Sequence, residues 1–124
     1  MDSGIVGLVP LLFGVVAVPL VCVAVTRAGA TGRLERNGAV GIRTRDTQVS
    51  DAAWQAGHAA ALPMVTRTVW VAVVAVVLAV ATHVAAGVPW AVLVGMAGLT
   101  VESVLLVLAA GAAGRAARAT AQPG

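Results

Sequence analysis

The sequence predicts an all-α membrane protein with three transmembrane helices in a single membrane domain, 1–124, and two observations support this prediction. Hydrophobic residues make up 60% of the chain and charged residues only 10%, whereas a soluble domain is about half apolar and about a quarter charged. Two stretches, 4–25 and 68–101, contain no Asp, Glu, Lys or Arg. Because a helix needs about 20 apolar residues to cross roughly 30 Å of hydrocarbon, these stretches have room for three crossings.

The first transmembrane helix is expected at about 4–26. Asp2 and the absence of a basic residue before this segment are unlike the start of a signal peptide, so we expect a retained anchor. Pro10 and Pro19 each remove a backbone donor, and each freed carbonyl needs a partner within the bundle. The single cysteine, Cys22, is expected to be a small apolar packing residue.

The second and third transmembrane helices are expected at about 66–87 and 90–111, as an antiparallel hairpin. The sequence GVPW at 87–90 interrupts the apolar stretch, and Gly and Pro favour a tight reversal there. Pro89 suits the first turn of the following helix. The small residues of GMAG at 95–98 permit close contact between helices.

The arginines predict how the helices are oriented. All eight basic residues are Arg; six lie in or beside the segment 27–65, and two lie in the tail 112–124. Three crossings place both segments on one side, so the positive-inside rule predicts an outer N-terminus and an inner C-terminus. The basic tail is expected to fray, with its arginines near anionic headgroups of the inner leaflet. Because this arrangement explains the basic charge, we expect no direct contact with nucleic acid.

The segment 27–65 then becomes a cytoplasmic loop, and it contains a short polar motif. Ser50 or Asp51 is suited to cap a helix over about 52–62, and Pro63 is expected to end this helix or to open the next span. We expect a short interfacial helix that lies on the inner leaflet. Trp54 favours the headgroup layer, where its ring is buried and its N–H is wet.

The motif reads RNGAVGIRTRDTQVSDAAWQAGH, and it resembles the signature of the SdpI family of small bacterial membrane proteins. That signature has an Asn, then Gly-x-Arg-Thr, then a Trp, followed by a His or Asn one helical turn later. The matching positions are Asn37, Gly41, Arg43, Thr44, Trp54 and His58. Two departures are Arg45, where the family often has Pro, and the length, since longer members have six spans.

Physical reasoning leaves two interpretations of each motif residue open. Gly41 permits a turn that a residue with a Cβ would resist. Arg43 and Arg45 are expected either to anchor on lipid phosphates or, for Arg43, to brace the loop or hold a ligand or partner. Trp54 and His58 are four residues apart and share a helix face. His58 is expected to be a wet surface residue or to contribute to the same partner contact.

Two further polar residues lie within the predicted spans. Glu102 lies near the bilayer centre, where a charged carboxylate is costly and functional roles are common. One hypothesis is structural: protonated Glu102 donates to the Val15 carbonyl, which Pro19 leaves free. The other is a proton-linked or ligand-binding role. His83, near the outer end of its span, is expected to be interfacial or to meet an external peptide.

The resemblance implies immunity or resistance to a membrane-active peptide toxin, with signalling to a cytoplasmic regulator as a further role. Two alternatives stay open: a small oligomeric transport element with Glu102 as its proton site, and an accessory subunit of a larger membrane complex. No residues have metal-ligand or catalytic spacing, so we expect no enzyme, metal or cofactor. The expected partners are the lipid bilayer of the bacterial plasma membrane, a peptide toxin, a cytoplasmic regulator and other copies of the chain as a homo-oligomer.

Overall fold

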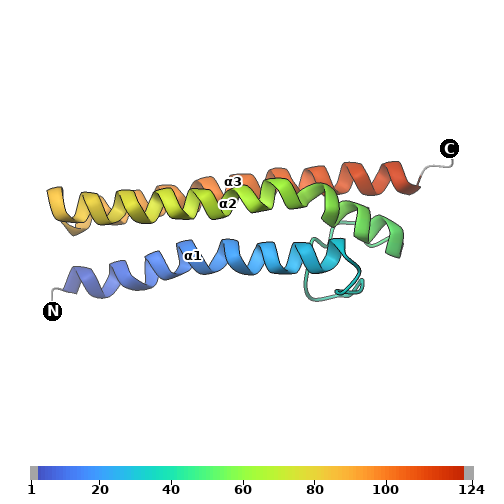
Figure 1. Ribbon diagram of the computed structural model, residues 1–124, viewed down its shortest axis with the longest axis horizontal. Helices are drawn as coiled ribbons and strands as arrows, with labels where there is room; N and C mark the ends of the chain where they lie inside the picture. Colours follow the sequence, from blue (N-terminus) through green and yellow to red (C-terminus); the bar gives the residue numbers. More distant parts are fainter. Residues whose placement is uncertain (1–2, 122–124) are drawn as a thin grey trace.

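The computed structural model describes residues 3–121, which form three long α-helices with no strand among them (Figure 1). The helices are α1 (Ser3–Ala30), α2 (Asp51–Ala86) and α3 (Val88–Ala121). Each is long and apolar enough to cross a membrane, which confirms the predicted all-helical class and three helices capable of spanning. We call the end that holds residues 31–50 the loop end, and the end that holds Gly87 the turn end.

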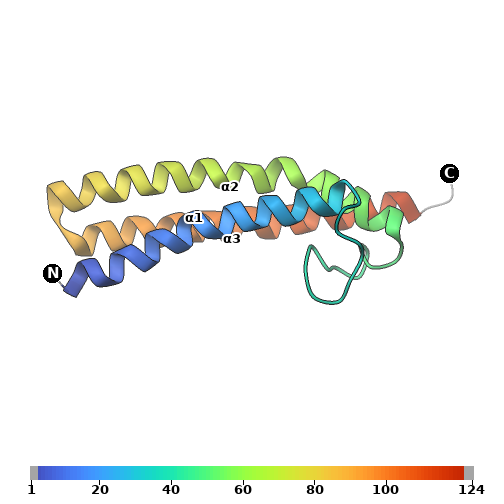
Figure 2. The ribbon, with the colours of Figure 1, turned by 60° about the horizontal axis from the view of Figure 1, so that its bottom comes forward.

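α2 and α3 form the predicted hairpin, and α1 lies along both of them (Figures 1 and 2). Gly87 makes the reversal with φ of 92°, and its N–H donates to the His83 carbonyl at 3.0 Å. A positive φ is a conformation that glycine adopts without steric cost. The start of α1 lies beside the start of α3, since a Cβ on Gly4 would be 2.8 Å from the Val88 side chain. α1 and α3 therefore run in the same direction.

Small residues form the seam between the helices. On α2 the buried residues from 61 to 79 follow alternating steps of four and three, the spacing of left-handed coiled coils. They are Ala61, Val65, Thr68, Ala72, Ala75 and Ala79. A Cβ on Gly98 of α3 would lie 2.7 Å from the Ala75 Cβ, so the two helices touch closely there. Close contact of this kind stabilises helix pairs in lipid, where the hydrophobic effect gives no drive for association.

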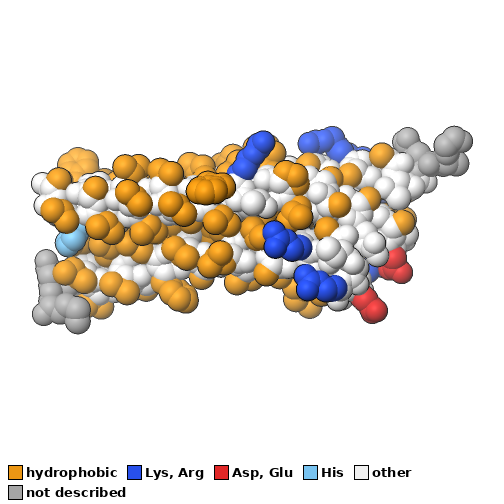
Figure 3. All heavy atoms as spheres, in the orientation of Figure 1, with side chains coloured by type: hydrophobic (Ala, Val, Ile, Leu, Met, Phe, Trp, Pro, Cys, Tyr) orange, Lys and Arg blue, Asp and Glu red, His pale blue; other side chains and the backbone are white. Residues whose placement is uncertain are grey.

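The face of the bundle seen in Figure 3 separates into two zones. Hydrophobic side chains cover the bundle from the turn end onward, and many of them are Val and Leu that point away from the core. Arginine and acidic side chains on the face shown gather toward the loop end. This separation gives the bundle an apolar belt and one charged end.

The prediction of a separate interfacial helix at 52–62 is wrong. α2 begins at Asp51, with Ser50 as the predicted cap accepting from the Ala53 N–H at 3.0 Å, but it then continues through Pro63 into the span. Figure 1 shows the first turns of α2 inclined to the rest of the helix. The helix stays continuous because residues on both sides of the proline, Ala61 and Val65, are buried in the same apolar cluster.

The tail 112–124 also differs from the expected frayed segment. α3 continues as a helix to Ala121, and residues 122–124 lie outside the described part of the chain. Ala113, Gly114 and Ala117 are buried, so this part of α3 packs against the loop end instead of standing free. Both α2 and α3 thus extend beyond their predicted spans and support the loop.

Candidate functional site

The loop 31–50 folds back onto the loop end of the bundle, and α2 supplies its two main supports, Trp54 and His58 (Figure 2). The rings of these two residues lie 4.3 Å apart, centroid to centroid. Their spacing of four on one helix face agrees with the prediction. Both side chains are buried, however, whereas the sequence predicted positions at the membrane surface.

Trp54 is a buried support of the loop, and its prediction as a headgroup anchor is wrong. The side chain is only 1% exposed. Its indole N–H donates to the Leu34 carbonyl at 2.9 Å, so the polar edge of the ring is satisfied by the loop backbone. A Cβ on Gly41 would lie 2.7 Å from the ring, and Gly41 has φ of 113°. Gly41 therefore meets two demands at once, a left-handed backbone and close approach to the indole.

His58 is also fully buried, at 0% exposure, which corrects its prediction as a wet surface residue. Its Nε2 accepts the Ile42 N–H at 3.0 Å, while its Nδ1 lies 2.7 Å from the Trp54 carbonyl. Because the backbone N–H must donate, the ring proton is assigned to Nδ1, which donates to Trp54. On its other side the ring packs directly against Gly29 of α1. His58 thus joins α1, α2 and the loop.

The neutral form of His58 suits this position. Burial lowers the pKa of His58 below its ordinary value, and the hydrogen bond to the Trp54 carbonyl opposes that shift only in part. A proton on Nε2 would face the Ile42 N–H, donor against donor. The loop structure therefore requires the uncharged ring.

Two threonines hold the loop from the other side of Ile42. Thr47 is 0% exposed, and its hydroxyl donates to the Ile42 carbonyl at 2.6 Å. The same hydroxyl accepts the Thr44 N–H at 3.0 Å, and the Thr44 hydroxyl accepts the Thr47 N–H at 3.2 Å. A Cβ on Gly57 would lie 2.7 Å from the Thr47 methyl group. Both backbone groups of Ile42 are thereby fixed by buried side chains.

Asn37 and Arg43 shape the remaining turn of the motif. The Asn37 side-chain oxygen accepts the Ala39 and Val40 N–H groups at 2.9 and 2.8 Å. The Arg43 guanidinium donates to the Gly38 carbonyl, which supports the interpretation that Arg43 braces the loop. Arg43 itself stays exposed, so its other donors face outward. All six motif residues therefore lie in or against one folded loop.

Ion pairs that sequence reasoning missed join the loop to the helices. Arg118 of α3 lies 2.6 Å from Asp46, and Arg36 lies 3.3 Å from Asp51 in the first turn of α2. Both pairs are partly exposed, and such pairs contribute only about 0–1 kcal/mol. In each pair the two residues are distant in the sequence, so no local sequence pattern predicts their contact. They fix position more than they add stability.

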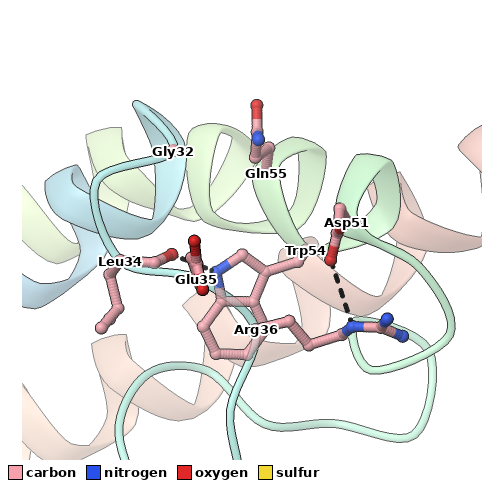
Figure 4. Close-up of a pocket in the computed structure, with 7 residues that line it drawn as sticks. All are labelled: Gly32, Leu34, Glu35, Arg36, Asp51, Trp54 and Gln55. Carbon is pink, nitrogen blue, oxygen red and sulfur yellow. Dashed lines mark hydrogen bonds and ion pairs between the residues drawn. The ribbon is translucent and has the colours of Figure 1, made fainter.

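A polar pocket of about 350 Å³ opens beside this loop (Figure 4). Its lining residues are Gly32, Leu34, Glu35, Arg36, Asp51, Trp54 and Gln55. Figure 4 shows Arg36 reaching toward Asp51 and the Trp54 indole turned toward Leu34. The pocket combines both signs of charge with an aromatic edge, a composition suited to a polypeptide surface.

Glu102 and His83, the two candidate residues within the spans, do not join this site. Glu102 is 1% exposed, and neither carboxylate oxygen has a hydrogen-bond partner among residues 3–121. The hypothesis that Glu102 donates to the Val15 carbonyl is therefore wrong in this structure. His83 lies near the turn end, opposite His58, with its Nδ1 buried and unpartnered within the described chain. No group of three metal-ligating side chains occurs among the described residues.

Comparison with known proteins gives one finding. A model described as the SdpI/YfhL protein family matches residues 33–113. The match runs from the loop through α2 and most of α3, and it covers more than half of the chain. The comparisons with curated proteins and with solved structures gave no match.

Proposed function

Because this chain belongs to the SdpI/YfhL protein family, we propose that it is a multi-pass protein of the bacterial plasma membrane that confers immunity to a membrane-active peptide toxin. One structural observation on this chain supports the proposal. The six residues of the family signature fix a single folded loop, through Trp54, His58 and the turn around Gly41. A loop held in advance loses less conformational entropy when a partner binds.

In this proposal the loop end faces the cytoplasm. All eight arginines lie in or beside the loop and the end of α3, while the N-terminus and the Gly87 turn have none. The positive-inside rule then gives an outer N-terminus and an inner C-terminus. The exposed arginines lie where anionic headgroups of the inner leaflet would hold them.

The membrane-spanning bundle and the loop have different tasks in this proposal. The toxin meets the bundle within the membrane, where a groove of about 550 Å³ runs between α2 and α3. Residues on its floor include Ala75 and Gly98, and its rim includes Trp70. Only apolar side chains line this groove, so it suits the apolar face of a membrane-active peptide. The loop, with its polar pocket, is the contact for a cytoplasmic regulator, and in this proposal immunity requires both the groove and the folded loop.

The test is the survival of a deletion strain of the source bacterium against a panel of membrane-active peptides. We expect deletion to increase killing by at least one peptide and to leave growth without peptide unchanged. Expression of the wild-type chain, with its membrane level checked by immunoblot, should restore survival. If deletion changes the killing curve of no peptide, the proposed immunity is refuted, and purification of membrane partners would test the accessory-subunit alternative.

A further inference from the structure

We propose that Glu102 is a proton-binding site inside the helix bundle, reached from the loop end through the cavity that residues 39–42 cover. This inference does not rest on the proposed immunity, because it concerns the bundle itself. It starts from one carboxyl group that the loop and its signature do not use.

The surroundings of Glu102 disfavour its charged form. On α3 it lies between Leu99, which packs against one apolar cluster, and Leu106, which packs against another. Neither of its oxygens accepts a hydrogen bond from the described residues. Burying an ionised carboxylate without a partner is far more costly than burying the neutral acid. The bundle therefore favours Glu102 with its proton bound.

No charged group on the neighbouring helices compensates for the carboxylate. On α1 the titratable groups are the half-buried Cys22 thiol and Arg27, which is exposed in the last turn at the loop end. On α2 the buried seam beside this part of α3 contains Thr68, whose hydroxyl already donates to the Val65 carbonyl, and alanines. Arg67, the basic residue of that part of α2, is exposed. A metal ion would need several oxygen ligands, which this seam does not offer, so the bound cation is a proton.

A route to this site begins under the loop. A cavity of about 370 Å³ lies between the loop and all three helices. Its lining residues are Val21, Cys22, Val25, Thr26, Ala39, Val40, Gly41, Ile42, Val65, Leu106 and Ala109. Leu106 is one helical turn from Glu102 on α3, and Cys22 of α1 lies in the same cavity wall. Of the loop residues in the cavity wall, Gly41 and Ile42 are held by Trp54 and His58, and Ala39 and Val40 by the Asn37 side chain.

Proton binding is tested by infrared difference spectra, between acid and alkaline pH, of the protein in lipid nanodiscs. We expect a C=O band of a protonated carboxyl group whose intensity falls as the pH rises, along a titration curve for a single proton. This band should be absent from Glu102→Gln. If that variant does not reach the membrane, Glu102→Asp assigns the band by shifting its frequency. A wild-type protein with no Glu102-dependent band at any pH that leaves it folded would overturn the proposal.

The route is tested with Cys22, the single cysteine of the chain. A small, membrane-impermeant thiol reagent should modify Cys22 in vesicles only when it is added on the loop side, and the modification should change the Glu102 titration. Ala39→Trp, which places bulk in the cavity wall, should slow the reaction, and Cys22→Ala should not react. Equal modification from both sides, or modification that leaves the titration unchanged, would contradict entry through this cavity.

Discussion

Replacing His58 with Phe removes one hydrogen-bond acceptor from the centre of the loop while keeping an aromatic ring between α1 and the loop. The Ile42 N–H, which donates to His58 Nε2 at 3.0 Å, would be left without an acceptor. The Trp54 carbonyl keeps its helical partner, because α2 continues through it. The cost is therefore that of one buried unsatisfied donor, about 1–3 kcal/mol.

This loss should appear in the loop before it appears in the bundle. Hydrogen exchange measured by mass spectrometry in lipid nanodiscs reports the opening of residues 36–48 directly. A loss of 1–3 kcal/mol corresponds to about 5–150-fold faster exchange of the amides that open with the loop. Peptides from the middle of α3 should exchange as in the wild type.

The matched control for His58→Phe is Gln55→Ala, which changes an exposed side chain one turn earlier on α2. In this control the exchange rate of residues 36–48 should stay within about twofold of the wild type, because surface substitutions usually change stability by no more than about 0.5 kcal/mol. Unchanged loop exchange in His58→Phe, at normal folding, would refute the argument that the histidine holds the loop.

Three other predictions follow from the same contacts. Because burial lowers the pKa of His58, the folded loop binds fewer protons than the open loop. The stability that His58 gives the loop is therefore present above about pH 6.5 and is lost as the pH falls below that value. Hydrogen exchange of the loop, corrected for its intrinsic pH dependence, should accelerate in acid in the wild type and not in His58→Phe. Gly41→Ala should destabilise the loop by about 1–3 kcal/mol, because it combines φ of 113° with a Cβ 2.7 Å from the indole, whereas Gly38→Ala, with no heavy atom within 4 Å, should change loop exchange little. Gly98→Ala should push α2 and α3 apart, because its Cβ would lie 2.7 Å from a facing alanine methyl group. The thermal unfolding temperature of the purified protein should therefore fall. Gly14→Ala, whose Cβ would have no heavy atom within 4 Å, should leave that temperature unchanged.

The sequence was sufficient to predict three helices and their hairpin. Long uncharged stretches leave few alternatives in lipid, and the GVPW reversal has a local signal at Gly87. Trp54 and His58 were expected on one helix face, which the structure confirms.

The sequence did not predict what that face meets. The acceptor for the Trp54 N–H is the Leu34 carbonyl, and the donor to His58 is the Ile42 N–H, so both partners are backbone groups with no sequence signal. A Trp and a His beside a membrane span are therefore easily assigned to the headgroup layer, although here they are the core of a small folded loop. The continuation of α2 through Pro63 has the same origin, because only the tertiary packing of Ala61 and Val65 decides it.

We propose that immunity requires the signature loop, and a comparison of Arg43 with Arg45 tests this requirement directly. Both are exposed arginines of one loop, but only Arg43 belongs to the signature and braces it through the Gly38 carbonyl. The measurement is survival of the deletion strain against the sensitising peptide, with Arg43→Ala or Arg45→Ala expressed at equal membrane abundance. We expect that Arg45→Ala restores wild-type survival and that Arg43→Ala does not, because the proposed function requires the braced loop. Equal rescue by both variants would contradict it.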